Sequence, residues 1–145
     1  MEVVNIYDEG LIFSPIHRVL FDIDHDKFIN EFTHFMMGDK KATIIDKDKN
    51  ISFSCPSDEI EFIFKTQQFI DSYLSCNGGR VDYVHDEDAV RQVCCQHNGL
   101  GILLYGIDKS TLFSYVINKG LLPRKSFSMG EANEKRYYIE ARKIK

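Results

Sequence analysis

The sequence predicts an α+β domain, in which a mixed sheet of about seven to eight strands carries about four packed helices. The chain has 145 residues, a typical length for one domain. Hydrophobic residues make up 43% of it and include 11 Phe and 7 Tyr, which is enough to fill a core. Strand-like runs and segments of helical spacing follow one another irregularly, which argues against a doubly wound parallel sheet. We therefore expect residues 1–145 to form a single domain.

The first forty residues contain three short runs rich in β-branched and aromatic side chains. These predict strands over Val3–Tyr7, Leu11–Phe13 and Val19–Ile23. A helix is predicted next, because Asp24 suits an N-cap and Gly38 suits a C-terminal stop. The apolar residues between them recur at helical spacing: Phe28, Ile29, Phe32, Phe35 and Met36.

A hairpin and the longest helix are predicted in the middle of the chain. Ala42–Asp46 and Ile51–Cys55 flank the polar run Lys-Asp-Lys-Asn, whose residues favour a turn. Ser57 is a suitable N-cap for the helix that follows, and this helix is expected to end at Asn77-Gly78-Gly79.

The remaining sequence predicts three strands and two helices. The strands span Arg80–His85, Leu100–Ile107 and Tyr137–Ile144. One helix begins at the acidic residues 86–88 and ends at Gly99, since negative charge favours a helix N-terminus. Asp108 caps the other, which ends at Gly120 and is expected to direct four apolar side chains inward: Leu112, Phe113, Val116 and Ile117.

Composition limits the classes of function. The net charge of −4 and the pI of 5.7 make nucleic acid an unlikely partner, because non-specific binding needs a broad cationic surface. The sequence shows neither a secretory leader nor an apolar run of about 20 residues, so we expect a cytoplasmic protein without a membrane partner. Four cysteines lack the spacing of a disulfide framework or zinc site and are expected to be reduced: Cys55, Cys76, Cys94 and Cys95.

The chemistry is expected in the basic C-terminal segment. Residues 121–145 hold seven Lys and Arg against three Glu, whereas residues 1–120 hold eleven against nineteen Asp and Glu. Arg124 and Lys125 supply cations, and residues 128–131 are expected to begin a short helical turn with free backbone N–H groups. The anion-binding candidates of this segment are Arg124, Lys125, Ser126, Ser128, Lys135 and Arg136, which suit a phosphate or a carboxylate on a small molecule. Alternatively, Glu131 and Glu134 pair with these cations on a solvated surface.

A second candidate lies near the N-terminus. His17 is a candidate catalytic residue, since an imidazole transfers protons near neutral pH. The adjacent Arg18 suits two-pronged contact with a planar anion. We expect the basic segment to fold beside both side chains and form one pocket. The alternative is that this His-Arg pair only fixes a loop through hydrogen bonds.

No metal site is predicted. Residues 83–88 include a histidine and three acids, but acids in the first turn of a helix are explained by the helix dipole. His25, His34 and His97 stand singly. The common glycine-rich phosphate loops and hydrolase motifs are absent from the sequence.

Four segments carry a family resemblance. They are Tyr7-Asp8-Glu9-Gly10-Leu11, Pro15-Ile16-His17-Arg18-Val19, Tyr83-Val84-His85 and Leu122-Pro123-Arg124-Lys125-Ser126-Phe127-Ser128-Met129-Gly130-Glu131-Ala132, followed by Lys135-Arg136-Tyr137-Tyr138. The chain resembles the C-terminal region of the bacterial domain of unknown function 1015 family over nearly all its length. The family's Asp-Gly-His-His-Arg motif is absent here. That motif is similar to one in the ParB and sulfiredoxin-like superfamily, which includes chromosome-partition proteins and kinases of free serine.

The resemblance implies that the chain is the C-terminal part of a longer architecture and that its missing N-terminal half is a partner. It implies a small-molecule, serine-type phosphotransferase, with a nucleotide and Mg as cofactors of the full-length protein. The positions expected to be shared with the family are Pro15, His17, Arg18, Pro123, Lys125 and Ser126. Because the upstream motif is missing, this chain alone is expected to be inactive. The alternatives are a packing or homodimerisation module and a ParB-like DNA-binding protein.

Overall fold

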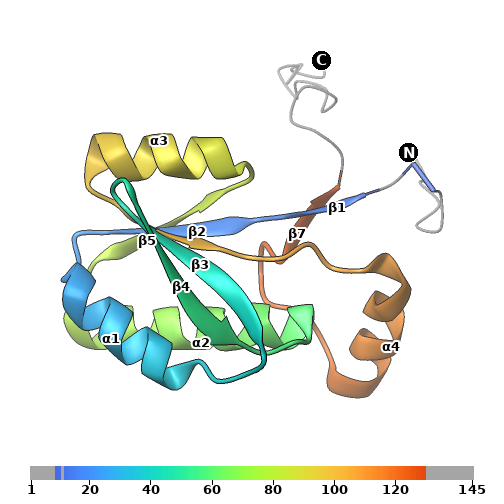
Figure 1. Ribbon diagram of the computed structural model, residues 1–145. Helices are drawn as coiled ribbons and strands as arrows, with labels where there is room; N and C mark the ends of the chain where they lie inside the picture. The colour runs from blue at the N-terminus through green and yellow to red at the C-terminus, as the bar shows by residue number, and fades with distance from the viewer. Residues whose placement is uncertain (1–8, 11, 130–145) are drawn as a thin grey trace, which may run out of the picture.

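The computed structural model describes residues 9–10 and 12–129, and it confirms the predicted α+β class (Figure 1). Its strands are β1 (Phe13–Pro15), β2 (His17–Phe21), β3 (Lys40–Asp46), β4 (Lys49–Cys55), β5 (Arg80–Val84), β6 (Leu100–Leu103) and β7 (Phe127–Met129). Its helices are α1 (His25–Phe35), α2 (Glu59–Asn77), α3 (Glu87–His97) and α4 (Lys109–Lys119). The predicted strands Val3–Tyr7 and Tyr137–Ile144 lie outside the described residues.

The strands form two sheets, so the prediction of one sheet with seven to eight strands is wrong. Five strands lie in the order β4-β3-β6-β2-β5, with antiparallel neighbours throughout, and β1 pairs with β7 in a separate two-stranded ribbon. β1 ends at Pro15, which has no backbone N–H to donate to a further ladder bond. The chain then enters the main sheet at His17.

Three helices connect parallel strands of the main sheet. Helix α1 links β2 to β3, α2 links β4 to β5, and α3 links β5 to β6. Both the α1 and the α3 connection move two positions toward β4 in the sheet order, but β2 and β5, from which they start, run in opposite directions. Since connections between parallel strands are right-handed, the two helices lie on opposite faces of the sheet. The same rule places α2 with α1, as Figure 1 shows.

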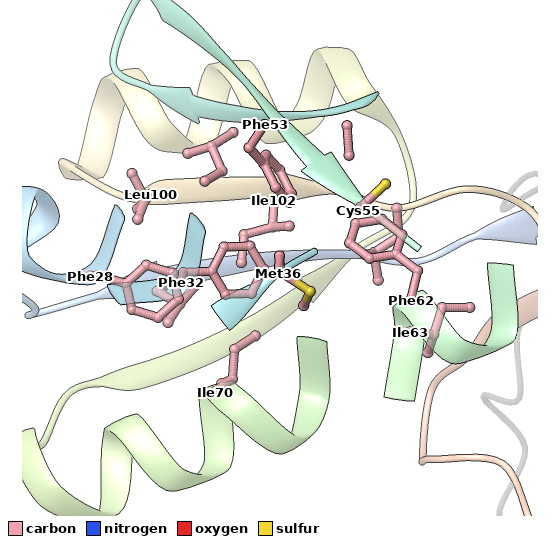
Figure 2. Packing of buried hydrophobic residues seen from close by; sticks show 14 of the residues in the cluster. Phe28, Phe32, Met36, Phe53, Cys55, Phe62, Ile63, Ile70, Leu100 and Ile102 are labelled. Atoms are coloured by element: carbon pink, nitrogen blue, oxygen red, sulfur yellow. The ribbon is translucent and has the colours of Figure 1, made fainter. Parts of the chain in front are cut away.

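The main core lies between the sheet and the α1–α2 layer. Figure 2 shows aromatic residues of α1, including Phe28 and Phe32, beside Ile70 of α2 and Ile102 of β6. A smaller cluster under α3 contains Val19, Phe21, Ile45, Val90 and Cys94. Alternate residues of β2 therefore serve different clusters, as the period of two in a strand requires.

Acidic N-caps fix the starts of α1, α2 and α4. The Asp24 carboxylate accepts a hydrogen bond from the Lys27 N–H at 3.0 Å, and Asp108 accepts one from Ser110, so both predicted caps are confirmed. For α2 the prediction was one residue early. Asp58 rather than Ser57 is the cap, because its carboxylate accepts from the N–H three residues on, that of Glu61, at 2.7 Å.

Helix α4 departs from the predicted packing. Leu112 is buried, but Phe113 is 42% exposed and Ile117 is 81% exposed, although both were expected to point inward. Figure 1 shows α4 near one end of the sheet rather than over either face, so only a narrow side of the helix is covered. The predicted strand Leu100–Ile107 is also shorter, because β6 ends at Leu103.

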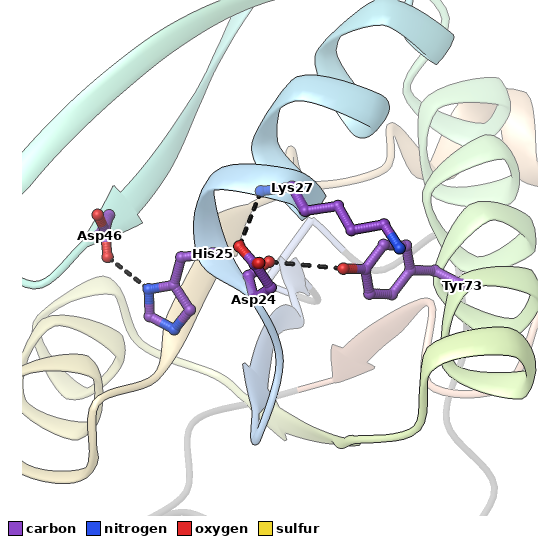
Figure 3. A network of polar contacts seen from close by, with 5 residues as sticks. All are labelled: Asp24, His25, Lys27, Asp46 and Tyr73. Atoms are coloured by element: carbon purple, nitrogen blue, oxygen red, sulfur yellow. Dashed lines mark hydrogen bonds and ion pairs between the residues drawn. The ribbon is translucent and has the colours of Figure 1, made fainter.

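A polar network joins the start of α1 to its neighbours (Figure 3). His25 Nδ1 lies 2.7 Å from Asp46 Oδ1 at the end of β3, and the Tyr73 hydroxyl of α2 donates a long 3.5 Å hydrogen bond to the Asp24 carbonyl. Although the sequence suggested an isolated histidine, His25 links two elements. Within residues 9–10 and 12–129, every helix is too short or too polar to cross a lipid bilayer.

Candidate functional site

Arg18 and Tyr83 lie at the end of the main sheet where β2 begins and β5 ends. They are Cα partners in the antiparallel β2–β5 pair, so their side chains project from the same face. This face also carries Leu20 and Val81, which pack into the core under α2. The site is thus backed by the main core.

Arg18 is a fully buried cation without a bonded carboxylate among the described residues. Its Nε donates to Gln67 Oε1 at 3.1 Å and its Nη1 donates to the Ile16 carbonyl at 2.6 Å, whereas the buried Nη2 has no partner in the described part of the chain. The Gln67 amide in turn donates to Asp71 at 2.9 Å. Burial lowers the pKa of Arg18 to about 10, so the group stays charged near neutral pH.

Three cations gather around the Tyr83 ring. The distances to the ring centroid are 4.6 Å for Arg18 Cζ, 4.5 Å for Lys125 Nζ and 5.9 Å for Arg124 Cζ. All are within the range of cation–π attraction. We call Arg18, Tyr83, Arg124 and Lys125 the cationic cluster. The Tyr83 hydroxyl is buried and, within the described part of the chain, has no hydrogen-bond partner.

The loop that carries Arg124 and Lys125 is fixed at both sides of its turn. Lys125 has a left-handed backbone with φ of 55°, and the Ser126 hydroxyl closes the turn by donating to the Pro123 carbonyl at 2.5 Å. The next residue, Phe127, begins β7 and stacks on Phe13 of β1 at 4.3 Å between ring centroids. These contacts position the loop beside β2 and β5.

The two serines that were predicted to bind the anion are buried and belong to the loop and to β7. Ser126 is buried and its hydroxyl proton is used within the loop. Ser128 is also buried and lies in β7, paired with Ser14. The prediction of a helical turn starting at Ser128 is therefore wrong for Ser128 and Met129, because strand pairing with β1 takes precedence there.

His17 points to the opposite face of the sheet from Arg18. Its Nδ1 accepts a hydrogen bond from the Leu104 N–H at 3.1 Å. Burial lowers the pKa of His17, although the carboxylates of Glu87 and Asp86 partly offset this effect. The imidazole is thus neutral near pH 7. The expectation of one pocket shared by His17 and Arg18 is wrong, since adjacent strand residues alternate between faces.

The remaining predicted groups have different outcomes. Lys135 and Arg136 lie outside the described residues, as do Glu131 and Glu134. In residues 9–10 and 12–129, no three His, Cys, Asp or Glu side chains gather in a way that would hold a metal ion. Glu87 of the acidic helix start instead pairs with Arg91 at 2.5 Å.

Sequence reasoning missed Gln67, which positions Arg18. The signal was present, because Gln67 lies four residues after Ile63 and three before Ile70 on the buried side of α2. A polar residue in an apolar stripe requires a buried hydrogen-bond partner. Tyr83 was not predicted as a site residue, yet its ring contacts the cations of the cluster.

Comparison with known proteins shows a likeness of fold. No family model matches the sequence, and a search of curated proteins found no relative. The solved structure of a conserved hypothetical protein from Pyrococcus furiosus is similar, with a TM-score of 0.67 and 11% sequence identity. The alignment covers 89% of this chain and 60% of that one, so our chain spans about three fifths of the neighbour's length. At this identity the likeness shows the fold alone.

Proposed function

We propose that this protein binds a small anionic molecule, preferably a phosphorylated one, at the cationic cluster. One observation carries the proposal. Arg18 is completely buried, yet its Nη2 has no partner among the described residues, and two further cations converge on the ring that Arg18 contacts. A buried guanidinium with an unused donor destabilises the fold, and an anion would use that donor once the residues that cover Nη2 move apart.

Electrostatics supports the same ligand class. Two like charges separated by roughly 8 Å repel by about 2 kcal/mol at an effective dielectric constant of 20. The charge of Arg124 lowers the pKa of Arg18 further, as expected for neighbouring cations. In the described part of the chain, neither Arg124 nor Lys125 has an ion pair with a carboxylate. A bound anion would relieve the repulsion.

The donor set favours phosphate over carboxylate. A guanidinium presents a planar fork to two oxygens, and a lysine ammonium adds a compact charge on a flexible stem. Arg124 and Lys125 are exposed and can close over a ligand, while Gln67 holds Arg18 in place. Phosphate offers three oxygens for such a combination, one more than a carboxylate.

The resemblance to the domain of unknown function 1015 family suggests how this site is used. We propose that the chain is the ligand-holding C-terminal part of a small-molecule, serine-type phosphotransferase. Catalytic groups, nucleotide and Mg would then belong to the N-terminal half that carries the Asp-Gly-His-His-Arg motif.

Isothermal titration tests the binding proposal. Inorganic phosphate, phosphoserine, 3-phosphoglycerate, ATP and ADP are titrated separately into the protein. We expect at least one to bind, and Lys125→Ala to weaken it by about tenfold or more, since a hydrogen bond to a charged group contributes about 1.5–3 kcal/mol. Lys119→Ala is the matched control, because Lys119 also lies over a tyrosine, Tyr115, at 5.5 Å. Absence of binding, or equal loss in both variants, would refute the proposal.

The alternative of internal charge pairing has its own test. If Glu131 and Glu134 neutralise the cluster, the double variant E131Q/E134Q should bind phosphate more tightly than the unchanged protein. Equal affinity in the two proteins would favour an open anion site.

Exposed apolar side chains favour a second candidate function. Phe113 and Ile117 lie one turn apart on α4, Leu121 follows the end of the helix, and the three are 42%, 81% and 85% exposed. Exposed apolar surface is typical of interaction sites, so these side chains support a homodimerisation module. Sedimentation that shows a monomer at all concentrations would count against it. DNA binding, our third candidate, is opposed by the net charge, and a mobility shift at low salt tests it directly.

A further inference from the structure

A pocket of about 400 Å³ opens beside His17 at the same end of the main sheet. Its walls are both apolar and polar, and they come from β2, β3, the end of β6 and the start of α3. The residues that define its chemistry are His17, Ala42, Glu87, Leu103, Leu104 and Tyr105. The volume lies within the range of about 300–1,000 Å³ that is usual for small-molecule sites.

His17 provides one directed polar group in this pocket. The side chain is only 6% exposed, and its Nδ1 is occupied as an acceptor by the Leu104 N–H. The proton of the neutral ring is therefore on Nε2. This nitrogen makes no hydrogen bond within the described part of the chain. It is also not fully enclosed by protein atoms. Nε2–H is thus open to the pocket as a donor.

The electrostatic surroundings differ from those of the cationic cluster. Glu87 lines the pocket, and the neighbouring Asp86 adds negative charge close to His17. Of the described residues, no lysine or arginine lines the pocket. The Glu87 carboxylate is paired with Arg91, so an anion would find no cation among the described residues of the pocket wall that is free to bind it.

We propose that this pocket is a second ligand site, specific for a small uncharged molecule with a planar apolar body and a carbonyl or amide oxygen. The oxygen accepts a hydrogen bond from His17 Nε2, and the body packs against Leu103, Leu104 and Tyr105. The pocket thereby adds a neutral ligand to the anion proposed for the cluster, on the other side of β2. Binding here does not depend on the anion site being correct.

Three probes of nearly equal shape test the proposal by NMR titration of the whole chain. Benzamide is neutral and offers an acceptor oxygen, benzoate is an anion, and benzamidine is a cation without an acceptor. We expect benzamide to shift the His17 ring nitrogens and the Leu104 amide, and to bind about tenfold more tightly than either analogue, since an unmade hydrogen bond or a repelled charge costs about 1–3 kcal/mol. Added phosphate should leave the benzamide shifts unchanged.

Variants and a direct contact measurement complete the test. His17→Phe should abolish the preference for benzamide, whereas Lys119→Ala, far along α4, should retain it. If His17→Phe does not fold, intermolecular NOEs between benzamide and Leu104 or Tyr105 in the unchanged protein decide the question. Absence of shifts and NOEs at millimolar benzamide, or tighter binding of benzoate or benzamidine, would overturn the proposal.

Discussion

Arg18 and Tyr83 face each other across the β2–β5 pair, with the guanidinium carbon 4.6 Å from the ring centroid. Each side chain buries a polar atom, Nη2 of Arg18 and the hydroxyl of Tyr83, that has no partner among the described residues. Each such atom destabilises the folded state by about 1–3 kcal/mol, so the pair lowers the stability of the protein. The predictions below follow from this pair and from the elements that surround it.

Tyr83→Phe should leave stability unchanged or raise it. The substitution removes a buried hydroxyl without a partner but keeps the ring on which Arg18 lies. We expect the free energy of unfolding in urea to increase by up to about 1 kcal/mol. Tyr83→Leu, which also removes the aromatic face, should be less stable than Tyr83→Phe. A loss of more than 1 kcal/mol in the Phe variant would mean that the hydroxyl has a partner.

Phosphate should stabilise the folded protein. A ligand that binds only the native state adds about 2.7 kcal/mol at 100 times its dissociation constant. Thermal unfolding in phosphate should therefore occur at higher temperature than in chloride of equal ionic strength. Lys125→Ala should lose most of this difference, while Lys119→Ala should keep it. Equal shifts in both variants would indicate a general salt effect.

Phe127→Ala should weaken anion binding without removing a charge. Phe127 stacks on Phe13 at 4.3 Å and joins the basic loop to the β1–β7 ribbon. Loss of the ring should let Arg124 and Lys125 sample more positions, which lowers affinity several-fold through ordering cost. Phe64→Ala, which removes a ring from the contact with Tyr115, is the control. Titration calorimetry measures both, and equal affinities in the two variants would contradict this role.

His17 should make the protein less stable in mild acid. Burial lowers the pKa of His17 below the unfolded value of 6.5, so the unfolded chain takes up a proton at a higher pH than the folded protein does. This contribution is fully present above pH 6.5 and is lost as the pH falls below that value. The stability difference between the unchanged protein and His17→Asn, measured in urea at pH 7.5 and 5.5, should shrink at the lower pH. A constant difference would show that His17 is not neutralised by the fold.

Only two of the four thiols should react with Ellman's reagent in the native protein. Cys76 and Cys95 are exposed, whereas Cys55 and Cys94 are buried. Burial raises the pKa of both buried thiols, to about 11 for Cys94, which suppresses the reactive thiolate. All four should react after unfolding. Rapid reaction of a third thiol under native conditions would require local opening of the core.

Elements fixed by local chemistry could be predicted from the sequence. Asp24 and Asp108 cap the helices that they were expected to cap, because N-cap hydrogen bonds involve only residues two or three positions apart. The split into two sheets could not be predicted in this way. The pairing of Ser14 with Ser128 spans most of the chain, and the local run after Phe127 suits a turn equally well.

In the candidate site, too, local features could be predicted from the sequence and long-range contacts could not. The basic character of Arg124 and Lys125 is visible in the sequence, but their approach to Arg18 depends on Tyr83, which a strand pattern presents as an ordinary packing residue. The opposite directions of His17 and Arg18 follow from the strand period alone. We expected one pocket for both because their chemistry, rather than their geometry, suggested cooperation.

Strand β2 separates the cationic cluster on one face of the sheet from the acidic surroundings of His17 on the other. A deletion or insertion of one residue before His17 would turn each side chain of the strand to the opposite face of the sheet, so His17 would lie on the face of the cationic cluster and Arg18 on the face of the Glu87 pocket. One such change would therefore alter the charge of both the cationic cluster and the His17 pocket. The short linker between the ribbon and the sheet is therefore the part of this molecule where length matters more than composition.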